Sequence, residues 1–102
     1  MTGSGGHPHR LRVSKQLRTL IRHLHPELKR KVRAALDEIL RDPTAGKTLG
    51  AELSGLRSFR VGRMRIIYRE AAPHVELIAL GPRRQIYADT LRLLKQEQNE
   101  VP

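Results

Sequence analysis

The chain has 102 residues, a length typical of one domain with a single hydrophobic core. Its formal net charge is +10, and 15 of its 20 basic residues are arginine. This excess indicates an anionic partner, either nucleic acid, an acidic protein or an anionic membrane surface, because the planar guanidinium group can bind a phosphate or carboxylate with two hydrogen bonds. The absence of cysteine excludes disulfides, thiolate zinc sites and cysteine nucleophiles.

Hydropathy argues against a membrane-spanning helix and a signal peptide, and we expect no membrane partner. No apolar run reaches the roughly 20 residues that a spanning helix requires, and the N-terminus lacks the apolar stretch of a signal peptide. We therefore expect a cytoplasmic protein. Aromatic residues make up only 3% of the chain, so we do not expect a platform that stacks several bases in a row.

The first half of the chain predicts a short strand followed by two helices. Residues 1–8 are rich in glycine and lack periodicity, which predicts a disordered leader. Residues 9–13 alternate between apolar and polar side chains, as in a strand with one wet face, and Ser14 is a suitable helix N-cap. Apolar residues then recur at helical spacing over residues 15–24, and Pro26 begins a second helix. Two helices with almost no linker form a hairpin that must pack on an apolar surface.

A connecting loop follows the second helix, which Asp42 and Pro43 end. Residues 44–55 contain three glycines, which favours a loop, and Leu49 and Leu53 are its expected apolar anchors. The loop leads into a stretch in which basic and apolar residues are interleaved.

Three strands are predicted in this stretch, and they cover residues 57–61, 63–70 and 75–80. Gly62 separates the first two strands, and residues 71–74 supply the second turn. Connections this short imply antiparallel pairing. From about Arg84 the pattern becomes helical again, and residues 98–102 form a polar tail.

The predicted order is therefore β-α-α-β-β-β-α within a single domain at residues 9–97. This order predicts an α+β fold, in which an N-terminal strand and a helical hairpin pack with an antiparallel sheet and a C-terminal helix. We expect the helices mainly on one face of the sheet, which leaves the other face to the arginines.

Five arginines and no acidic residue occur between residues 57 and 69. They are Arg57, Arg60, Arg63, Arg65 and Arg69. Apolar residues separate them, so a sheet can bury one side of these strands and present guanidinium groups on the other. Such a surface suits an anion.

At this point the sequence resembles a known family. The motif L-x-G-x-R-S-x-R-V-G-x-x-R-I-I-Y at residues 53–68 precedes L-G-P-R-R-Q-I-Y at residues 80–87, and both follow a helical hairpin. This combination resembles the RelE/ParE superfamily, the toxins of type II toxin-antitoxin pairs, over about residues 9–97. The resemblance implies a toxin that a cognate antitoxin silences by wrapping its surface.

The superfamily has two branches with different targets. The resemblance to the RelE-like branch implies a metal-independent endoribonuclease that cuts messenger RNA in the ribosomal A site and inhibits translation. The resemblance to the ParE-like branch implies inhibition of DNA gyrase without catalysis. A third interpretation is an inactive module that binds nucleic acid or protein with the same fold.

RelE-like relatives imply the roles of individual residues in this chain. The implied catalytic residues are Arg60, Arg65, Arg83 and Tyr87. The expected RNA-binding residues around them are Arg57, Ser58, Arg63 and Arg84. Arg60 and Arg65 flank the Gly62 turn on paired strands, so both can reach one phosphate. Spacing alone leaves open whether Arg83 or Arg84 faces the site.

The sequence departs from the pattern of the nuclease branch in two respects. Pro82 replaces the polar or basic residue that often precedes the loop arginine in that branch. The central strands contain no lysine or histidine, and Ser58 occupies a position where a second basic group is expected. Arginine hardly serves as a general base because its pKa is too high. Catalysis would then depend on charge stabilisation, alignment of the substrate and Tyr87. We expect no metal and no other cofactor, because the histidines lack companions at ligand spacing.

Overall fold

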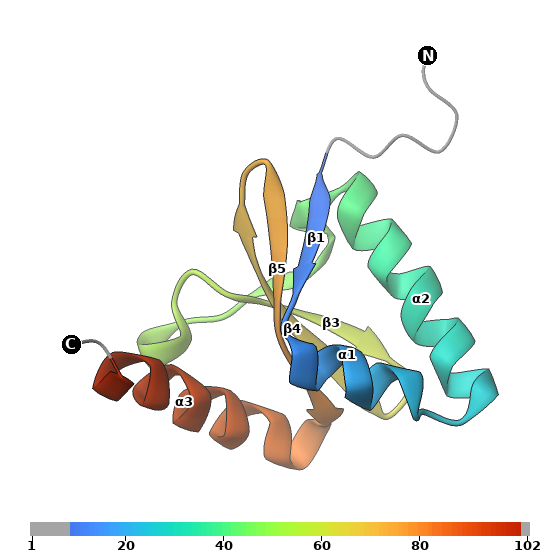
Figure 1. Cartoon of the computed structure of the whole chain (residues 1–102). Coiled ribbons are helices and arrows are strands. Elements are labelled where there is room, and N and C mark those ends of the chain that lie inside the picture. The colour runs from blue at the N-terminus through green and yellow to red at the C-terminus, as the bar shows by residue number, and fades with distance from the viewer. Residues whose placement is uncertain (1–8, 101–102) are drawn as a thin grey trace.

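The computed structural model describes the backbone of residues 9–100 and the side chains of residues 9–96, and the expected leader at residues 1–8 lies outside this range. The strands are β1 (Arg10–Val13), β2 (Lys47–Thr48), β3 (Arg57–Val61), β4 (Met64–Ala71) and β5 (His74–Pro82). The helices are α1 (Lys15–Arg22), α2 (Pro26–Arg41), α3 (Arg83–Glu100) and the 3-10 turns η1 (Pro43–Ala45) and η2 (Ala51–Leu53). The predicted α+β fold is confirmed (Figure 1).

One five-stranded sheet runs through the molecule in the order β1-β5-β4-β3-β2. The predicted hairpins are antiparallel, as are β2 and β3, whereas β1 pairs with β5 in parallel. The sequence did not indicate this parallel partner, because the pairing joins residues that lie far apart in the chain. It also did not indicate β2, whose two residues lie within the predicted loop.

Local capping explains where the helices begin and end. The Ser14 Oγ accepts a hydrogen bond from the Leu17 N–H at 3.1 Å, which confirms the predicted N-cap of α1. Pro26 occupies the first turn of α2, as predicted. At the end of α2, Asp42 accepts hydrogen bonds from the N–H and the hydroxyl of Thr44, and these bonds lower the pKa of the Asp42 carboxyl.

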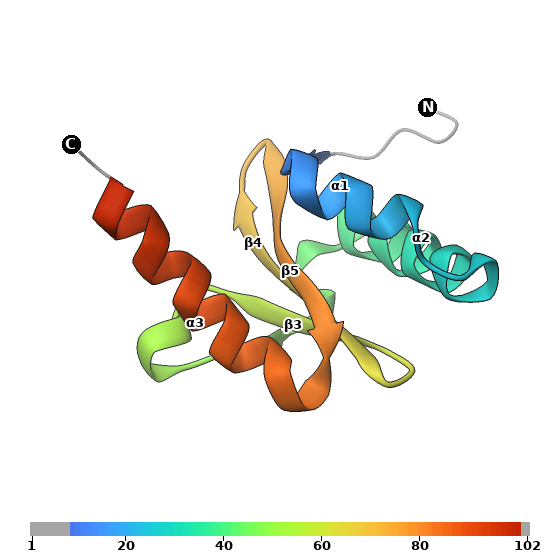
Figure 2. The same ribbon diagram turned by 60° about the horizontal axis from the view of Figure 1, so that its bottom comes forward.

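The two faces of the sheet carry different helices. α1 and α2 pack on one face, and α3 crosses the other, as Figure 2 shows. The larger core cluster joins α2 to the sheet through side chains that include Ile39, Ile66 and Val75, all fully buried. The expectation that the second face is left to the arginines is therefore corrected. Ile67 and Ile86 form a second buried cluster there, which α3 covers.

An irregularity in β5 changes which face of the sheet its side chains occupy. The pairing of β4 with β5 shifts between Ile67 and Tyr68, because β5 contains one extra residue, Ile78. The extra residue reverses the alternation of side chains along β5. As a result Leu77 and Leu80 both belong to the core under α2, although strict alternation would place them on opposite faces.

The connecting loop is attached to the sheet by Tyr68, which is fully buried. Its hydroxyl donates to the Pro43 carbonyl at 2.7 Å and accepts from the Gly46 N–H at 2.8 Å. A Cβ atom at Gly46 would lie 2.5 Å from the Tyr68 Oη, so glycine allows this close approach. Leu49 and Leu53 pack against the second cluster, and this confirms them as apolar anchors.

The last helix is longer than the sequence suggested. α3 runs to Glu100, so residues 98–100 are helical although we expected a tail, and residues 101–102 lie outside the described residues. Within the described part of the chain, none of the helices combines the length and the apolar character that a membrane span needs.

Candidate functional site

The β3–β4 hairpin places two of the predicted catalytic arginines opposite each other. Gly62 adopts a positive φ of 60° in the turn, a conformation that favours glycine. The resulting register makes Arg60 and Arg65 direct cross-strand partners. Because such partners share a face of the sheet, both side chains rise from the face that α3 partly covers.

An open pocket of about 530 Å³ lies where this hairpin meets the start of α3. Its lining consists of Arg60, Gly62, Arg63, Met64, Arg65, Pro82, Arg83, Arg84 and Gln85. The end of β5 reaches the hairpin because Pro82 pairs with Met64, and the Arg83 N–H donates to the Arg63 carbonyl at 3.4 Å. The lining includes five arginines and no acidic residue, so its potential favours an anion.

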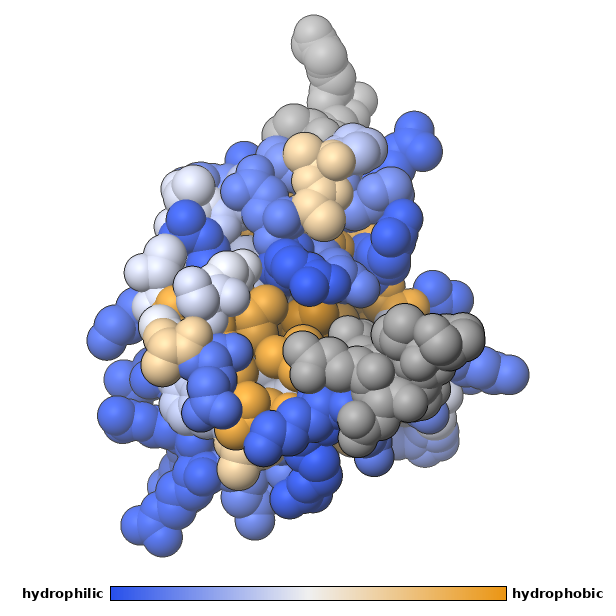
Figure 3. Space-filling view, turned by 90° about the vertical axis from the view of Figure 1, so that its left-hand side faces the viewer, coloured by the Kyte–Doolittle hydropathy of each residue, from blue (hydrophilic) through white to orange (hydrophobic). Residues whose placement is uncertain are grey.

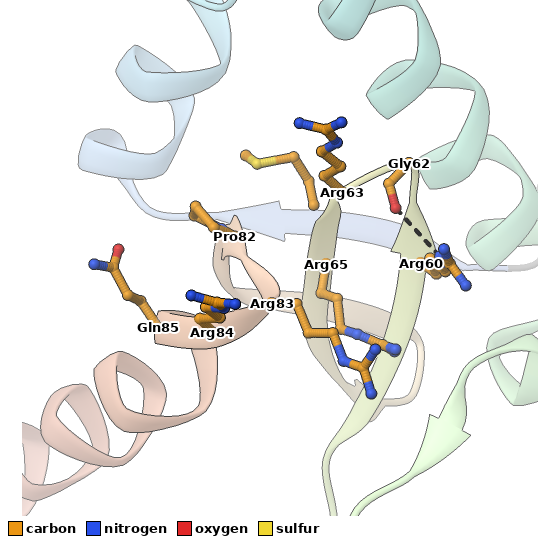
Figure 4. A pocket seen from close by; sticks show the side chains of 9 residues that line it. Arg60, Gly62, Arg63, Arg65, Pro82, Arg83, Arg84 and Gln85 are labelled. Carbon is orange, nitrogen blue, oxygen red and sulfur yellow. Dashed lines mark hydrogen bonds between the residues drawn. The ribbon is translucent and has the colours of Figure 1, made fainter.

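The arginines of the pocket do not all point the same way. In Figure 4 the guanidinium groups of Arg65 and Arg83 extend toward the same region, whereas the Arg63 side chain points away from them. The Arg60 Nε donates to the Gly62 carbonyl at 3.2 Å, so this side chain bends back to its own turn. Both Arg83 and Arg84 line the pocket, and in this view it is the Arg83 side chain that extends in the direction of Arg65.

Arg65 belongs to a chain of hydrogen bonds with two hydroxyl groups. Its Nη1 donates to the Ser58 Oγ at 3.2 Å, and the Ser58 Oγ lies 3.4 Å from the Tyr87 Oη. Because a guanidinium group can only donate, the Ser58 Oγ accepts from Arg65. Either hydroxyl can be the donor between Ser58 and Tyr87, since a serine oxygen can accept two hydrogen bonds.

Within the part of the chain that the structure describes, the charge of Arg65 is not balanced by a carboxylate. Among the described residues, no acidic side chain pairs with Arg60, Arg65 or Arg83. Glu76 pairs with Arg69, and Glu70 pairs with His9. The Arg65 Nε is also buried without a hydrogen-bond partner among the described residues. A buried donor without an acceptor costs free energy, so an anionic ligand would relieve this cost.

Two of the four predicted RNA-binding residues do not line the pocket. Arg57 lies on the opposite face, where its Nη1 donates to the Gly46 carbonyl at 2.9 Å. Ser58 is only 3% exposed, so its hydroxyl serves Arg65 and Tyr87 instead of a surface contact. Arg63 and Arg84 do line the pocket.

The pocket can stabilise negative charge, but its lining offers no general base. Its lining contains no histidine, lysine or carboxylate, and arginine keeps its proton at physiological pH. Within the part of the chain that the structure describes, no group of three or more His, Cys, Asp or Glu residues is arranged to hold a metal ion. Gln85, in the first turn of α3, is a polar lining residue that sequence reasoning missed, although its place beside Arg84 was a usable signal.

Comparison with solved structures shows that chains of two toxin-antitoxin complexes share this fold. The toxin-antitoxin complex RelBE2 from Mycobacterium tuberculosis contains a chain that is 29% identical, with a TM-score of 0.64, and the match covers 74% of this chain and 99% of that chain. The archaeal RelE-RelB complex from Pyrococcus horikoshii OT3 has the same fold at 20% identity and a TM-score of 0.59, with 74% and 96% covered. No curated protein matches the chain significantly.

A sequence family identifies the chain more directly. The model of the family described as "ParE toxin of type II toxin-antitoxin system, parDE" matches residues 10–87. This span covers most of the domain, from the start of β1 through Tyr87, and therefore includes the whole arginine pocket. The chain thus belongs to the ParE toxin family of type II toxin-antitoxin systems.

Proposed function

We propose that this toxin is a messenger RNA endoribonuclease that cuts in the context of a translating ribosome in the cytoplasm. The observation that supports this proposal is the Arg65 guanidinium, which lines the same pocket as Arg83, donates to Ser58 and has one buried N–H without a partner among the described residues. A phosphate group matches this arrangement, since two arginines on one phosphate form strong charge-assisted hydrogen bonds.

In the proposed reaction the 2′-hydroxyl of RNA attacks the adjacent phosphorus, and the bond from phosphorus to the 5′ oxygen breaks, which gives a 2′,3′-cyclic phosphate and a free 5′-hydroxyl. The 2′-hydroxyl proton passes to solvent water, which also returns a proton to any side chain that protonates the departing oxygen. Arg65 and Arg83 stabilise the negative charge that grows on the phosphate oxygens, and Arg60 reaches the same phosphate after leaving the Gly62 carbonyl. The Tyr87 hydroxyl, oriented by Ser58, donates to the departing oxygen or contacts a base.

The proposed nuclease works without a side chain that accepts the proton of the 2′-hydroxyl at neutral pH. Its rate then depends on alignment and charge stabilisation, two effects that are large when groups are held in place. We therefore expect slow cleavage, with the ribosome contributing to the alignment of the message.

The second candidate function is inhibition of DNA gyrase without catalysis. Two observations favour it, namely the match to the ParE family and the absence of a titratable base from the pocket lining. In this case the arginines bind an anionic surface of the target and cut nothing. The third candidate, an inactive interaction module, predicts no toxicity.

We further propose that a cognate antitoxin binds this chain. The net charge of +10 favours an acidic partner, and the Mycobacterium tuberculosis relative was solved in a toxin-antitoxin complex.

Inducible expression in a bacterium that lacks the antitoxin separates the three candidates. For the nuclease, primer extension on an abundant message a few minutes after induction shows new 5′ ends inside codons, and these ends disappear in Arg65→Ala and Arg83→Ala. Arg69→Ala is the matched control, because Arg69 lies outside the pocket and pairs with Glu76. Growth arrest with intact message and a DNA-damage response would favour gyrase. The absence of growth arrest would favour the module.

A further inference from the structure

The proposed reaction uses only the arginines of the pocket lining. The lining also contains three uncharged side chains, Met64, Pro82 and Gln85, which have no role in that reaction. A phosphate group alone leaves these side chains without a contact. They suit a ligand that carries an uncharged part beside its phosphate.

Met64 and Pro82 form an apolar wall at the pocket. They are cross-strand partners in the pairing of β4 with β5, so their side chains share a face of the sheet. Met64 is half-buried and Pro82 is exposed, and neither side chain has a hydrogen-bond donor. The pocket lining contains no aromatic ring. A flat ligand group therefore packs here against this wall or against the plane of a guanidinium group.

Gln85 supplies a strong hydrogen-bond acceptor that the rest of the lining lacks. Its carboxamide both donates and accepts, whereas the guanidinium groups of the lining only donate. Gln85 is exposed in the first turn of α3. In Figure 4 it lies on the side of Arg84 away from Arg83. The uncharged and the phosphate-binding parts of the pocket therefore lie next to each other.

Another hollow of the molecule lacks this combination. Figure 3, which looks toward the side on which α3 ends, shows apolar side chains gathered in a hollow with hydrophilic side chains around it. The groove of about 700 Å³ between α1 and α3 has one arginine in its lining, Arg12, and one carboxylate, Glu76. The arginine pocket joins its uncharged side chains to five arginines and no carboxylate. It is the better match for a ligand with both a phosphate and an uncharged part.

We propose that Met64, Pro82 and Gln85 form a subsite for the base of the nucleotide whose phosphate lies at Arg65 and Arg83. This proposal rests on the proposed function, since it takes an RNA phosphate as the ligand of the arginines. The base packs on the apolar wall, and the Gln85 carboxamide bonds to its edge. The pocket volume of about 530 Å³ is in the range of sites that hold small ligands.

Glutamine at this position holds a base without selecting its identity. The pairing edge of each RNA base presents one donor beside one acceptor, and a carboxamide turned by half a rotation matches either order. A carboxylate can only accept. Gln85→Glu should therefore favour guanine, whose edge carries two adjacent N–H donors.

Fluorescence anisotropy at fixed salt, with strands that carry a single base, tests the subsite. The probes are short labelled strands of stable abasic 2′-deoxyribose analogues, in which one central nucleotide carries adenine, cytosine, guanine, uracil or no base. They have no 2′-hydroxyl, so the proposed reaction cannot cut them, and the base can reach the subsite in any register. We expect each base to strengthen binding by about threefold to tenfold over the fully abasic strand, as one hydrogen bond does. The affinities of the four base-bearing strands should agree within about threefold.

A matched control for Gln85→Glu lies on the same helix. Gln96→Glu makes the same change at an exposed residue outside the pocket, about 16 Å further along α3. Gln85→Glu should prefer the guanine strand by about threefold or more, and Gln96→Glu should show no such preference. Pro82→Ala should reduce the gain from every base, with little change for the fully abasic strand. Circular dichroism verifies that each variant folds.

The two proposals fail in distinguishable ways. If the parent chain binds the fully abasic strand and a base adds nothing, the base subsite is wrong although the arginines bind phosphates. The subsite is also wrong if Gln85→Glu and Gln96→Glu have the same base preferences, or if the parent chain prefers one base by more than about tenfold. If the parent chain binds neither these strands nor an unmodified RNA of the same length, the proposed nuclease function is wrong together with the subsite.

Discussion

Neighbouring residues of β4 serve two different environments. Ile66 and Tyr68 are fully buried in the core under α1 and α2, whereas Arg65 lies on the opposite face, partly buried in the pocket. The first face gains free energy from apolar burial, and the second keeps a buried guanidinium N–H without an acceptor among the described residues. The comparison teaches that one strand can stabilise the fold with one face and keep, on the other face, an unpaired donor that the proposed phosphate site would use.

The strongest test of this division removes the Ile66 side chain. Ile66→Ala should lower the free energy of unfolding by about 2–5 kcal/mol, since Ile66 is fully buried and the substitution leaves a cavity. Urea denaturation followed by circular dichroism measures the loss. Ile66→Val, which removes one methyl group, should cost only about 0.5–1.5 kcal/mol. Equal losses for both variants would show that this face packs loosely.

Arg65→Ala should weaken RNA binding without lowering stability, the reverse of the result expected for Ile66→Ala. It removes charge-assisted hydrogen bonds of about 1.5–3 kcal/mol, so we expect a loss of about 10- to 100-fold in affinity for a short single-stranded RNA. Fluorescence anisotropy at fixed salt measures the affinity. The free energy of unfolding should stay the same or rise, because a buried donor without a partner is removed. A clear loss of stability would mean that Arg65 belongs to the core instead of the site.

The two tyrosines allow a third test. Tyr68→Phe leaves the buried Pro43 carbonyl and Gly46 N–H without their partner, so it should cost about 1–3 kcal/mol of stability. Tyr87→Phe removes a hydroxyl on the other face and should leave stability nearly unchanged, while the proposed cleavage slows. Thermal unfolding and primer extension on both variants provide the comparison. An equal loss of stability in the two variants would contradict the expected difference between the tyrosines.

The pH dependence of stability should depend on Tyr68. Burial raises its pKa above the ordinary value of 10.0. The folded chain therefore holds this proton more tightly than the unfolded chain, and the resulting stability is present below pH 10 and lost as pH rises through the folded pKa. Urea denaturation between pH 8 and the alkaline limit, about pH 11, should show a smaller advantage of the parent chain over Tyr68→Phe at the upper end. A constant difference would argue against burial of the phenol.

The smallest expected effect concerns Ser58. Ser58→Ala removes an acceptor for Arg65 and the hydrogen-bond partner of the Tyr87 hydroxyl, so we expect the proposed cleavage to slow by about tenfold or less. A double-mutant cycle with Tyr87→Phe tests whether the two hydroxyls act together, since independent residues give additive effects. Additive losses would show that Ser58 does not orient Tyr87.

Much of the fold followed from local signals in the sequence. The sequence correctly marked two helix starts, at Ser14 and Pro26, and the turn at Gly62. The bounds of β3 were predicted without error. The parallel pairing of β1 with β5 was not predictable in the same way, because nothing in either segment specifies a distant partner. α3 packs on the second face of the sheet through a few buried side chains. In the sequence, the alternation of side chains did not distinguish these residues from those of the first core.

The candidate site was predictable to a similar extent. The short Gly62 turn was enough to pair Arg60 with Arg65. The spacing of three residues between Arg57 and Arg60 was also informative, since residues an odd number apart in a strand face opposite ways, and it should have separated Arg57 from the site. The link from Ser58 to Tyr87 was not predictable, because it depends on where α3 crosses the sheet.

The extra residue in β5 also limits how the length of this strand can change. Deleting Ile78 would restore regular pairing with β4 and would turn one half of β5 over relative to the other. Leu77 or Leu80 would then leave the core under α2, and the start of α3 would be reoriented together with its arginines. A single-residue deletion in this strand is therefore a change to the whole domain, whereas the loop at residues 49–55 offers exposed positions where a deletion affects fewer contacts.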